Sequence, residues 1–136
     1  MKRFALMLLL AAGIASATAA DTQPVWEGAN LLISQKGIAK RSVLLHSNGS
    51  FPKGAVLTSV LWRYELLSRN STGLHASLCI PGQCVRLNGQ NGSTEMFAGL
   101  SAETPFYLVF HVPGKGALRQ PMRVTKYQLI VNYTKK

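Results

Sequence analysis

The apolar and polar positions of this chain follow the pattern of short β-strands separated by turns. Residues 55–67, AVLTSVLWRYELL, carry apolar side chains at every second position from 60 to 66, and Ser59, Arg63 and Glu65 fall on the other face. Strict alternation places neighbouring side chains on opposite faces, so it predicts a strand with one buried face. The same period returns in residues 122–133, with apolar side chains at 127, 129, 131 and 133 on one face and Ile130 on the other.

Other segments give further strands. Residues 104–112, TPFYLVFHV, are apolar on both faces, as in a central strand or one whose second face is an interface. Weaker patterns predict short strands at 31–34 and 42–46, on either side of a basic loop, and at 94–98, after two Asn-Gly turns. No stretch has a 3.6-residue apolar period. Seven or eight short strands at regular spacing predict an all-β fold, an antiparallel β-sandwich or a small barrel, and we expect the sandwich.

The first twenty residues have the composition of a cleavable export signal. A basic start, Met1-Lys2-Arg3, precedes an apolar run over 4–14 and small residues over 15–20. A membrane span needs roughly 20 apolar residues, and this run is too short, so we expect no stable membrane insertion. Cleavage is expected after Ala19 or Ala20. The domain prediction is therefore a signal peptide over 1–20 and a single β-sandwich domain over 21–136, which is long enough for one core.

The only two cysteines, Cys79 and Cys84, flank a four-residue turn, Ile80-Pro81-Gly82-Gln83. Pro at the second position and Gly at the third suit a type II turn, which places the cysteines opposite each other in a hairpin. Thiols of an exported chain are expected to oxidise. A redox site would use C-x-x-C at a helix start, and a metal site needs three or four ligands. We therefore expect a structural disulfide, on the outer and wetter face of the hairpin.

Charge adds a candidate binding surface. Two of the fifteen Lys and Arg residues lie in the signal, so the rest of the chain has thirteen basic and five acidic residues, a net charge of +8. Lys36, Lys40 and Arg41 form the one local group before the Lys135-Lys136 tail. This group is either a solvated basic surface or a contact for an acidic protein or an anionic envelope surface. Because the protein is expected to be exported, we expect no nucleic acid partner.

Few residues suggest catalysis. The five carboxylates form no paired motif, there is no G-x-S-x-G, and PGKGA at 113–117 lacks the Lys-Ser/Thr of a phosphate loop. The histidines His46, His75 and His111 have no metal-ligand spacing with the cysteines. A lone histidine in a strand is more often packed or at an edge than a catalytic base. We expect no catalytic residues, no metal and no cofactor.

Aromatic residues keep one alternative function open. Trp26, Trp62 and Tyr64 could stack on sugar rings, as in β-sandwich modules that bind carbohydrate. Trp62 and Tyr64 share the apolar face of their strand, so core packing is the preferred interpretation for them. A carbohydrate-binding module for envelope glycans remains the alternative hypothesis.

An ordered set of residues across most of the chain resembles one known family. It comprises Trp62-Arg63-Tyr64, Gly73-Leu74, Leu78-Cys79, Cys84-Val85, Leu87, Gly89-Gln90, Gly92, Phe97, Gly99, Val112-Pro113-Gly114 and Ile130-Val131-Asn132-Tyr133. This combination resembles FlhE, a family of small periplasmic proteins of enterobacterial flagellar systems. The likeness is densest from Leu61 to Gly92 and weakest from Asn30 to Gly54.

The resemblance implies a non-enzymatic accessory protein of flagellar assembly that acts in the periplasm. Members are thought to be chaperone-like partners of axial components, or to limit proton leak through the export gate. The implied partners are therefore flagellar rod or export-gate proteins. The family provides no catalytic residues to carry over to this sequence.

Overall fold

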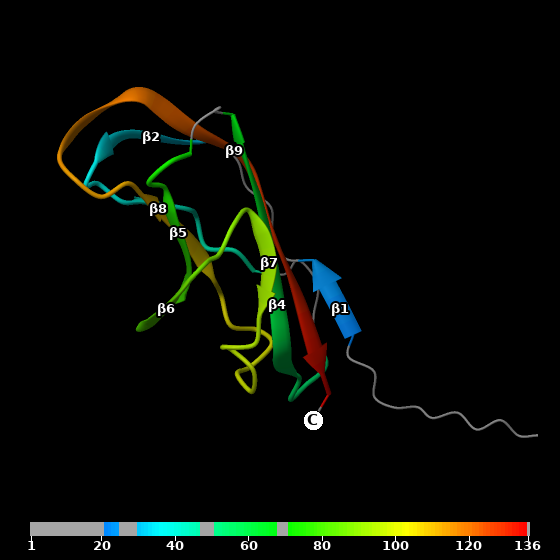
Figure 1. Ribbon diagram of the computed structural model, residues 1–136. Coiled ribbons are helices and arrows are strands. Elements are labelled where there is room, and N and C mark those ends of the chain that lie inside the picture. Colours follow the sequence, from blue (N-terminus) through cyan, green and yellow to red (C-terminus); the bar gives the residue numbers. More distant parts are fainter. Residues whose placement is uncertain (1–20, 25–29, 47–50, 68–70, 136) are drawn as a thin grey trace, which may run out of the picture.

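The computed structural model describes residues 21–24, 30–46, 51–67 and 71–135 of the 136-residue chain. In these ranges the chain forms two antiparallel sheets with a shared apolar core (Figure 1). The strands are β1 (Asp21–Pro24), β2 (Leu31–Lys36), β3 (Lys40–Arg41), β4 (Val56–Leu67), β5 (His75–Ile80), β6 (Gln83–Arg86), β7 (Asn91–Thr94), β8 (Tyr107–His111) and β9 (Gly116–Thr134). The predicted antiparallel β-sandwich is confirmed. The predicted signal over 1–20 lies outside the described residues.

The two long strands β4 and β9 form the centre of a five-stranded sheet. Its order is β1-β9-β4-β7, and β2 also pairs with β9. The strand β9 is long enough to pair with β2 near its start and with β1 near its end, as Figure 1 shows along its orange-to-red length. The second sheet has the order β3-β8-β5-β6.

The predicted alternation in β4 and β9 is confirmed. Val60, Trp62 and Tyr64 are buried, as are the apolar side chains at 127, 129, 131 and 133. The phase of β9 changes near Thr125, where the register with β4 shifts opposite Glu65 and Leu66. An extra residue in one strand moves the following side chains to the other face. The bulge therefore lets positions 122 and 124 face the core as well.

The strand predicted at 94–98 is displaced toward the N-terminus. The observed strand is β7, and its Asn91-Gly92 pair, which the sequence suggested was a turn, lies inside it. Gly92 is paired with Trp62, and a Cβ at Gly92 would lie 2.7 Å from Cζ2 of the indole. The indole Nε1 donates a hydrogen bond to the Gly89 carbonyl oxygen at 3.2 Å. The glycine thus makes room for the ring, a tertiary requirement that a local turn pattern does not reveal.

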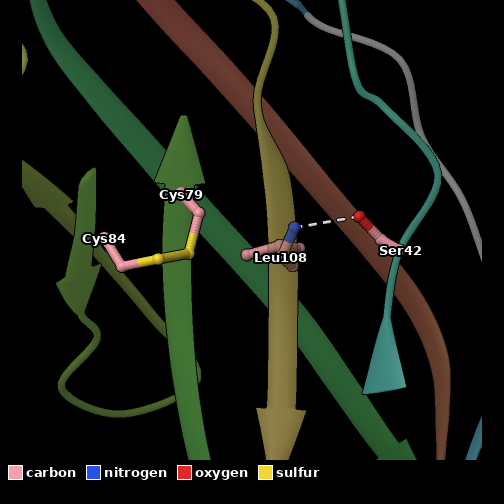
Figure 2. Close-up of a disulfide and its surroundings, with 4 residues drawn as sticks. All are labelled: Ser42, Cys79, Cys84 and Leu108. Atoms are coloured by element: carbon pink, nitrogen blue, oxygen red, sulfur yellow. Dashed lines mark hydrogen bonds between the residues drawn. A yellow bond between two sulfur atoms is a disulfide. The ribbon is translucent and has the colours of Figure 1, made fainter. Parts of the chain in front are cut away.

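One buried hydroxyl completes the pairing between the edge strand β3 and β8. Ser42 follows β3 directly and is only 5% exposed. Its backbone N–H donates to the Leu108 carbonyl oxygen, and its Oγ accepts a hydrogen bond from the Leu108 N–H at 2.9 Å (Figure 2). In a regular antiparallel pair the second acceptor would be a backbone carbonyl. The serine side chain therefore satisfies a buried amide where the regular ladder ends.

Two chain segments cross between the sheets side by side. The turn from β2 to β3 and the loop from β8 to β9 each leave one sheet and enter the other. They meet at Gly37, whose N–H donates to the Val112 carbonyl oxygen at 2.6 Å. Gly37 has a φ of 79°, and a Cβ there would lie 2.5 Å from the Gly114 carbonyl oxygen. This corner fixes how β3 and β8 approach each other.

The predicted basic loop over 35–41 is wrong. Lys36 is the last residue of β2, and Lys40 and Arg41 form β3, so only residues 37–39 connect the strands. Pairing with β8 and β9 organises these residues, and the local sequence does not encode that pairing. The three basic residues thus belong to two different sheets.

Candidate functional site

The disulfide hairpin forms with the register expected from the sequence. Cys79 and Cys84 are directly paired and joined by a disulfide, with their Cα atoms 4.1 Å apart (Figure 2). Gly82 has a φ of 83°, as the third position of a type II turn requires. The expected exposure is correct for one cysteine only. Cys84 is exposed, whereas Cys79, which lies between Cys84 and Tyr107 in the sheet, is fully buried.

Replacing both cysteines by alanine is expected to lower the free energy of unfolding by no more than about 2 kcal/mol, because the closed loop is short. The residue separation is five, and the Pro81-Gly82 turn favours the hairpin without the bond. Urea unfolding of the oxidised protein, the reduced protein and the double variant tests this expectation. Complete unfolding on reduction would contradict it and would make the bond essential to the fold.

The second sheet exposes a face built from alternate residues of its four strands. Because side chains alternate along a strand, the residues that share the face of Cys79 are the odd-numbered ones of β5 and β8. Their inward neighbours at 76, 78, 108 and 110 are buried in the core. The outward positions form three cross-strand rows: Arg41-Val109-Ser77-Arg86 in the middle, with the pair His75-His111 on one side and Tyr107-Cys79-Cys84 on the other. We call this surface the outer face of the β3-β8-β5-β6 sheet.

The three predicted partner-binding residues do not form one patch. Arg41 lies on the outer face, with its guanidinium carbon 3.8 Å from the centre of the Tyr107 ring. Lys40 is the preceding residue of the same short strand, so its side chain points to the opposite side. Lys36 lines a separate hollow of about 650 Å³, together with Thr72 before β5 and with Arg119 and other residues of β9. Only Arg41 therefore belongs to the outer face.

Two histidines that were unassigned in the sequence meet on this face. His75 on β5 is paired with His111 on β8, and their ring centres are 5.1 Å apart. Partial burial lowers the pKa of His75, and the positive charge of Arg86 and the neighbouring His111 lower it further. The ring of His75 is therefore neutral near pH 7 and takes up a proton only at lower pH.

The four strands of this face carry no acidic side chain. Among the residues that the structure describes, the carboxylates outside β1 are Glu65 on β4, Glu95 and Glu103. Glu65 accepts a hydrogen bond from Arg63 at 3.4 Å on the other sheet, and Glu95 and Glu103 lie in the segment between β7 and β8. No strand of the four-stranded sheet contributes a carboxylate. These four strands therefore place basic side chains on the outer face and no carboxylate.

Among the described residues, the aromatic side chains considered for sugar binding do not form a site in the structure. Trp62 and Tyr64 are each 7% exposed and pack in the core, so they offer no platform for a sugar ring. Trp26 lies outside the described residues. Across the described ranges, no group of three or more His, Cys, Asp or Glu side chains could hold a metal ion, and no helix is long and apolar enough to span a membrane.

Sequence reasoning did not join Arg86 and Tyr107 to Arg41 in one surface. The alternation of 75–78 and 106–110 already placed 77, 107 and 109 on one face, and the hairpin register placed residue 86 beside residue 77. The missing information was the pairing of β8 with both β3 and β5, which joins segments far apart in the sequence.

The fold and this site define a β-sandwich protein with a disulfide-bonded hairpin and a basic outer sheet face. A family model described as flagellar protein FlhE matches residues 30–134. The chain belongs to the FlhE family.

Relatives from enterobacteria agree with this assignment. FlhE of Salmonella typhimurium is 38% identical over 106 residues, which is 78% of this chain and 80% of the relative. FlhE of Escherichia coli K12 is 40% identical over 82 residues, covering 60% of this chain and 63% of the relative, so this match spans less than two thirds of the relative's length. The resemblance noted in the sequence is thus confirmed as a family relationship.

Solved structures support the fold. A crystal structure of FlhE superposes with a TM-score of 0.76 at 35% identity and covers 84% of this chain and 96% of that chain. A serine protease of Aeromonas sobria gives a TM-score of 0.63 at 12% identity, over 88% of this chain but only 28% of the protease chain. At that identity the second likeness shows a shared fold alone.

Proposed function

We propose that this protein is a non-enzymatic periplasmic accessory protein of flagellar assembly that binds rod or export-apparatus components. The observation that carries the proposal is family membership over most of the chain, since the family is flagellar. A chaperone-like contact with an axial component is the mode of action that we favour. Limiting proton leak through the export gate is an alternative consequence of the same binding.

The chemistry of the chain supports an exported binding protein. A disulfide between Cys79 and Cys84 persists in oxidising compartments such as the bacterial periplasm. The amino-terminal sequence has the composition of an export signal. The basic outer face offers a surface for association, and electrostatic complementarity of this kind favours fast encounter with a partner.

Crosslinking in a flagellated host tests the proposal. The chain is expressed with its own amino terminus, crosslinked in intact cells, and purified from the periplasmic fraction for mass spectrometry. Rod or export-gate subunits are expected among the crosslinked proteins, and a deletion strain is expected to assemble flagella abnormally. Normal flagella and motility in the deletion strain, together with no flagellar subunit among the captured proteins, would refute the proposal.

A further inference from the structure

We infer that the outer face of the β3-β8-β5-β6 sheet is the docking surface for an acidic, extended segment of a partner protein. The inference deepens the proposed function, because it rests on this protein acting by binding another protein. It names both the surface on this chain and the chemistry of the segment that the surface accepts.

The arrangement of cations across the sheet sets the spacing of the partner's charges. Arg41 on β3 and Arg86 on β6 occupy the two ends of one cross-strand row, with Val109 and Ser77 between them. Neighbouring strands lie about 4.8 Å apart, so the row is about 14 Å long. An extended chain rises about 3.3 Å per residue. Carboxylates about four residues apart in an extended segment would therefore reach both arginines.

The centre of the face suits the apolar part of such a segment. Tyr107 and Val109 are half-buried, and the disulfide of Cys79 lies in the row of Tyr107, next to the row of Val109. The Tyr107 ring stacks under the Arg41 guanidinium, which restrains this long side chain before a partner arrives. The disulfide holds β6, and with it Arg86, in register with β5. Groups fixed in advance lose less entropy when they bind.

The other sheet lacks this pattern. On its exposed side Arg63 is paired with Glu65, and the amide of Asn132 donates to the Ser59 hydroxyl at 2.8 Å. The nearby hollow of about 370 Å³ is lined mostly by uncharged residues of β4, β7 and β9. The other sheet also carries basic side chains, on β2 and β9, but its strand β4 holds the carboxylate of Glu65, whereas β3, β5, β6 and β8 hold none.

A peptide titration followed by NMR tests the surface without any flagellar component. The probe is the peptide Ac-EEYVEE-NH2, and its control is Ac-QQYVQQ-NH2. With ¹⁵N-labelled protein purified from the periplasm, amide shifts are expected in β3, β5, β6 and β8 for the acidic peptide and not for the control. Shifts confined to other strands would overturn the inference.

Charge-matched variants separate a defined surface from overall charge. R41Q/R86Q is expected to weaken binding of the acidic peptide about tenfold, because two exposed ion pairs with the peptide are lost. R119Q/R123Q removes two exposed charges from β9 and is expected to change binding less than twofold. If the double variant unfolds, peptide binding is measured with R86Q alone, which changes one exposed residue on the short edge strand β6. Equal weakening by both double variants would overturn the inference in favour of net charge.

The histidine pair provides a second readout. Arg41, Arg86, Tyr107 and His111 are the charged or titratable groups that share the face with His75. Because protonation of His75 adds a positive charge to the face, the acidic peptide is expected to bind more tightly as the pH falls from 7.5 to 5.5. The variant H75Q is expected to show a smaller gain than wild type, and an unchanged pH response in it would count against the surface.

Three outcomes distinguish failure of the proposed docking surface from failure of the proposed function, and both from binding to a lipid membrane. Flagellar subunits that crosslink equally to wild type and R41Q/R86Q would overturn the surface and leave the proposed function standing. Peptide binding at the face, with no flagellar subunit crosslinked and normal flagella and motility in the deletion strain, would support the surface and refute the function. Binding of wild type, but not of R41Q/R86Q, to vesicles containing phosphatidylglycerol, with no binding of the acidic peptide, would replace the protein segment by a membrane surface.

Discussion

Replacing Gly37 by alanine is expected to lower the free energy of unfolding by about 2 to 5 kcal/mol. Two costs combine at this position. A φ of 79° is in the left-handed region, where a non-glycine residue costs about 1 to 2 kcal/mol. The new Cβ would also lie 2.5 Å from the Gly114 carbonyl oxygen, and relieving such a contact in a packed site typically costs about 1 to 3 kcal/mol.

The cost is high because the obstructing atom is backbone. The Gly114 carbonyl belongs to the loop between β8 and β9, and Gly37 is hydrogen-bonded to Val112 at the start of that loop. The two crossing segments would have to separate, and β3 would lose its fixed approach to β8. We therefore expect the variant to disturb the position of Arg41 as well as the stability.

Gly82→Ala is the matched control for Gly37→Ala. Gly82 has a φ of 83°, almost the same as Gly37, but a Cβ at Gly82 would have no atom within 4 Å. It should show the conformational cost alone, about 1 to 2 kcal/mol. Urea denaturation of both variants gives the difference. Equal losses of stability would show that the contact with Gly114 contributes nothing.

Replacing Ser42 by alanine is expected to cost about 2 to 3 kcal/mol. The Leu108 N–H donates to the Ser42 hydroxyl oxygen, and Leu108 is fully buried. Alanine leaves this amide without an acceptor, and a buried donor that loses its partner costs about 1 to 3 kcal/mol. The upper part of the range applies because a fully buried amide has no exposed surface from which water could replace the hydroxyl.

Ser101→Ala provides the comparison for Ser42→Ala. The Ser101 hydroxyl also accepts a backbone hydrogen bond, from Glu103 at 3.1 Å, but the site is exposed and water can replace the hydroxyl. We expect this variant to lose less than about 1 kcal/mol in the same urea titration. Slow hydrogen exchange of the Leu108 amide in wild type, and faster exchange in Ser42→Ala, would locate the effect at β8. A loss in Ser42→Ala no larger than in Ser101→Ala would contradict the role of the buried hydroxyl.

The sequence was sufficient to predict those features of the fold that depend on neighbouring residues alone. The alternation of 60–66 placed Trp62 and Tyr64 in the core, and the Pro81-Gly82 turn placed Cys79 opposite Cys84. Both inferences rely on a period of two or on a turn of four residues, which neighbouring residues encode directly.

The candidate site was only partly predictable because it is assembled from distant segments. Arg41 was singled out as a basic residue, but it was grouped with Lys36 and Lys40, which the sheets direct elsewhere. Its actual companions, Tyr107 and Arg86, come from β8 and β6. Pairing across such separations depends on how whole strands pack, so no short window of sequence contains it.

The sequence by itself determined the all-β class, the disulfide-bonded hairpin and the inward faces of β4 and β9. The set of family-like residues along the chain also determined membership of the FlhE family. Tertiary structure alone decided that Asn91-Gly92 is strand rather than turn, because the Trp62 indole needs the space that a missing Cβ leaves. It also decided that the basic residues divide between two sheets, because β2 pairs with β9 whereas β3 pairs with β8, and Gly37 and Gly114 let the two crossing segments touch. Periodicity is a property of adjacent residues, whereas close backbone approach is a property of the assembled fold.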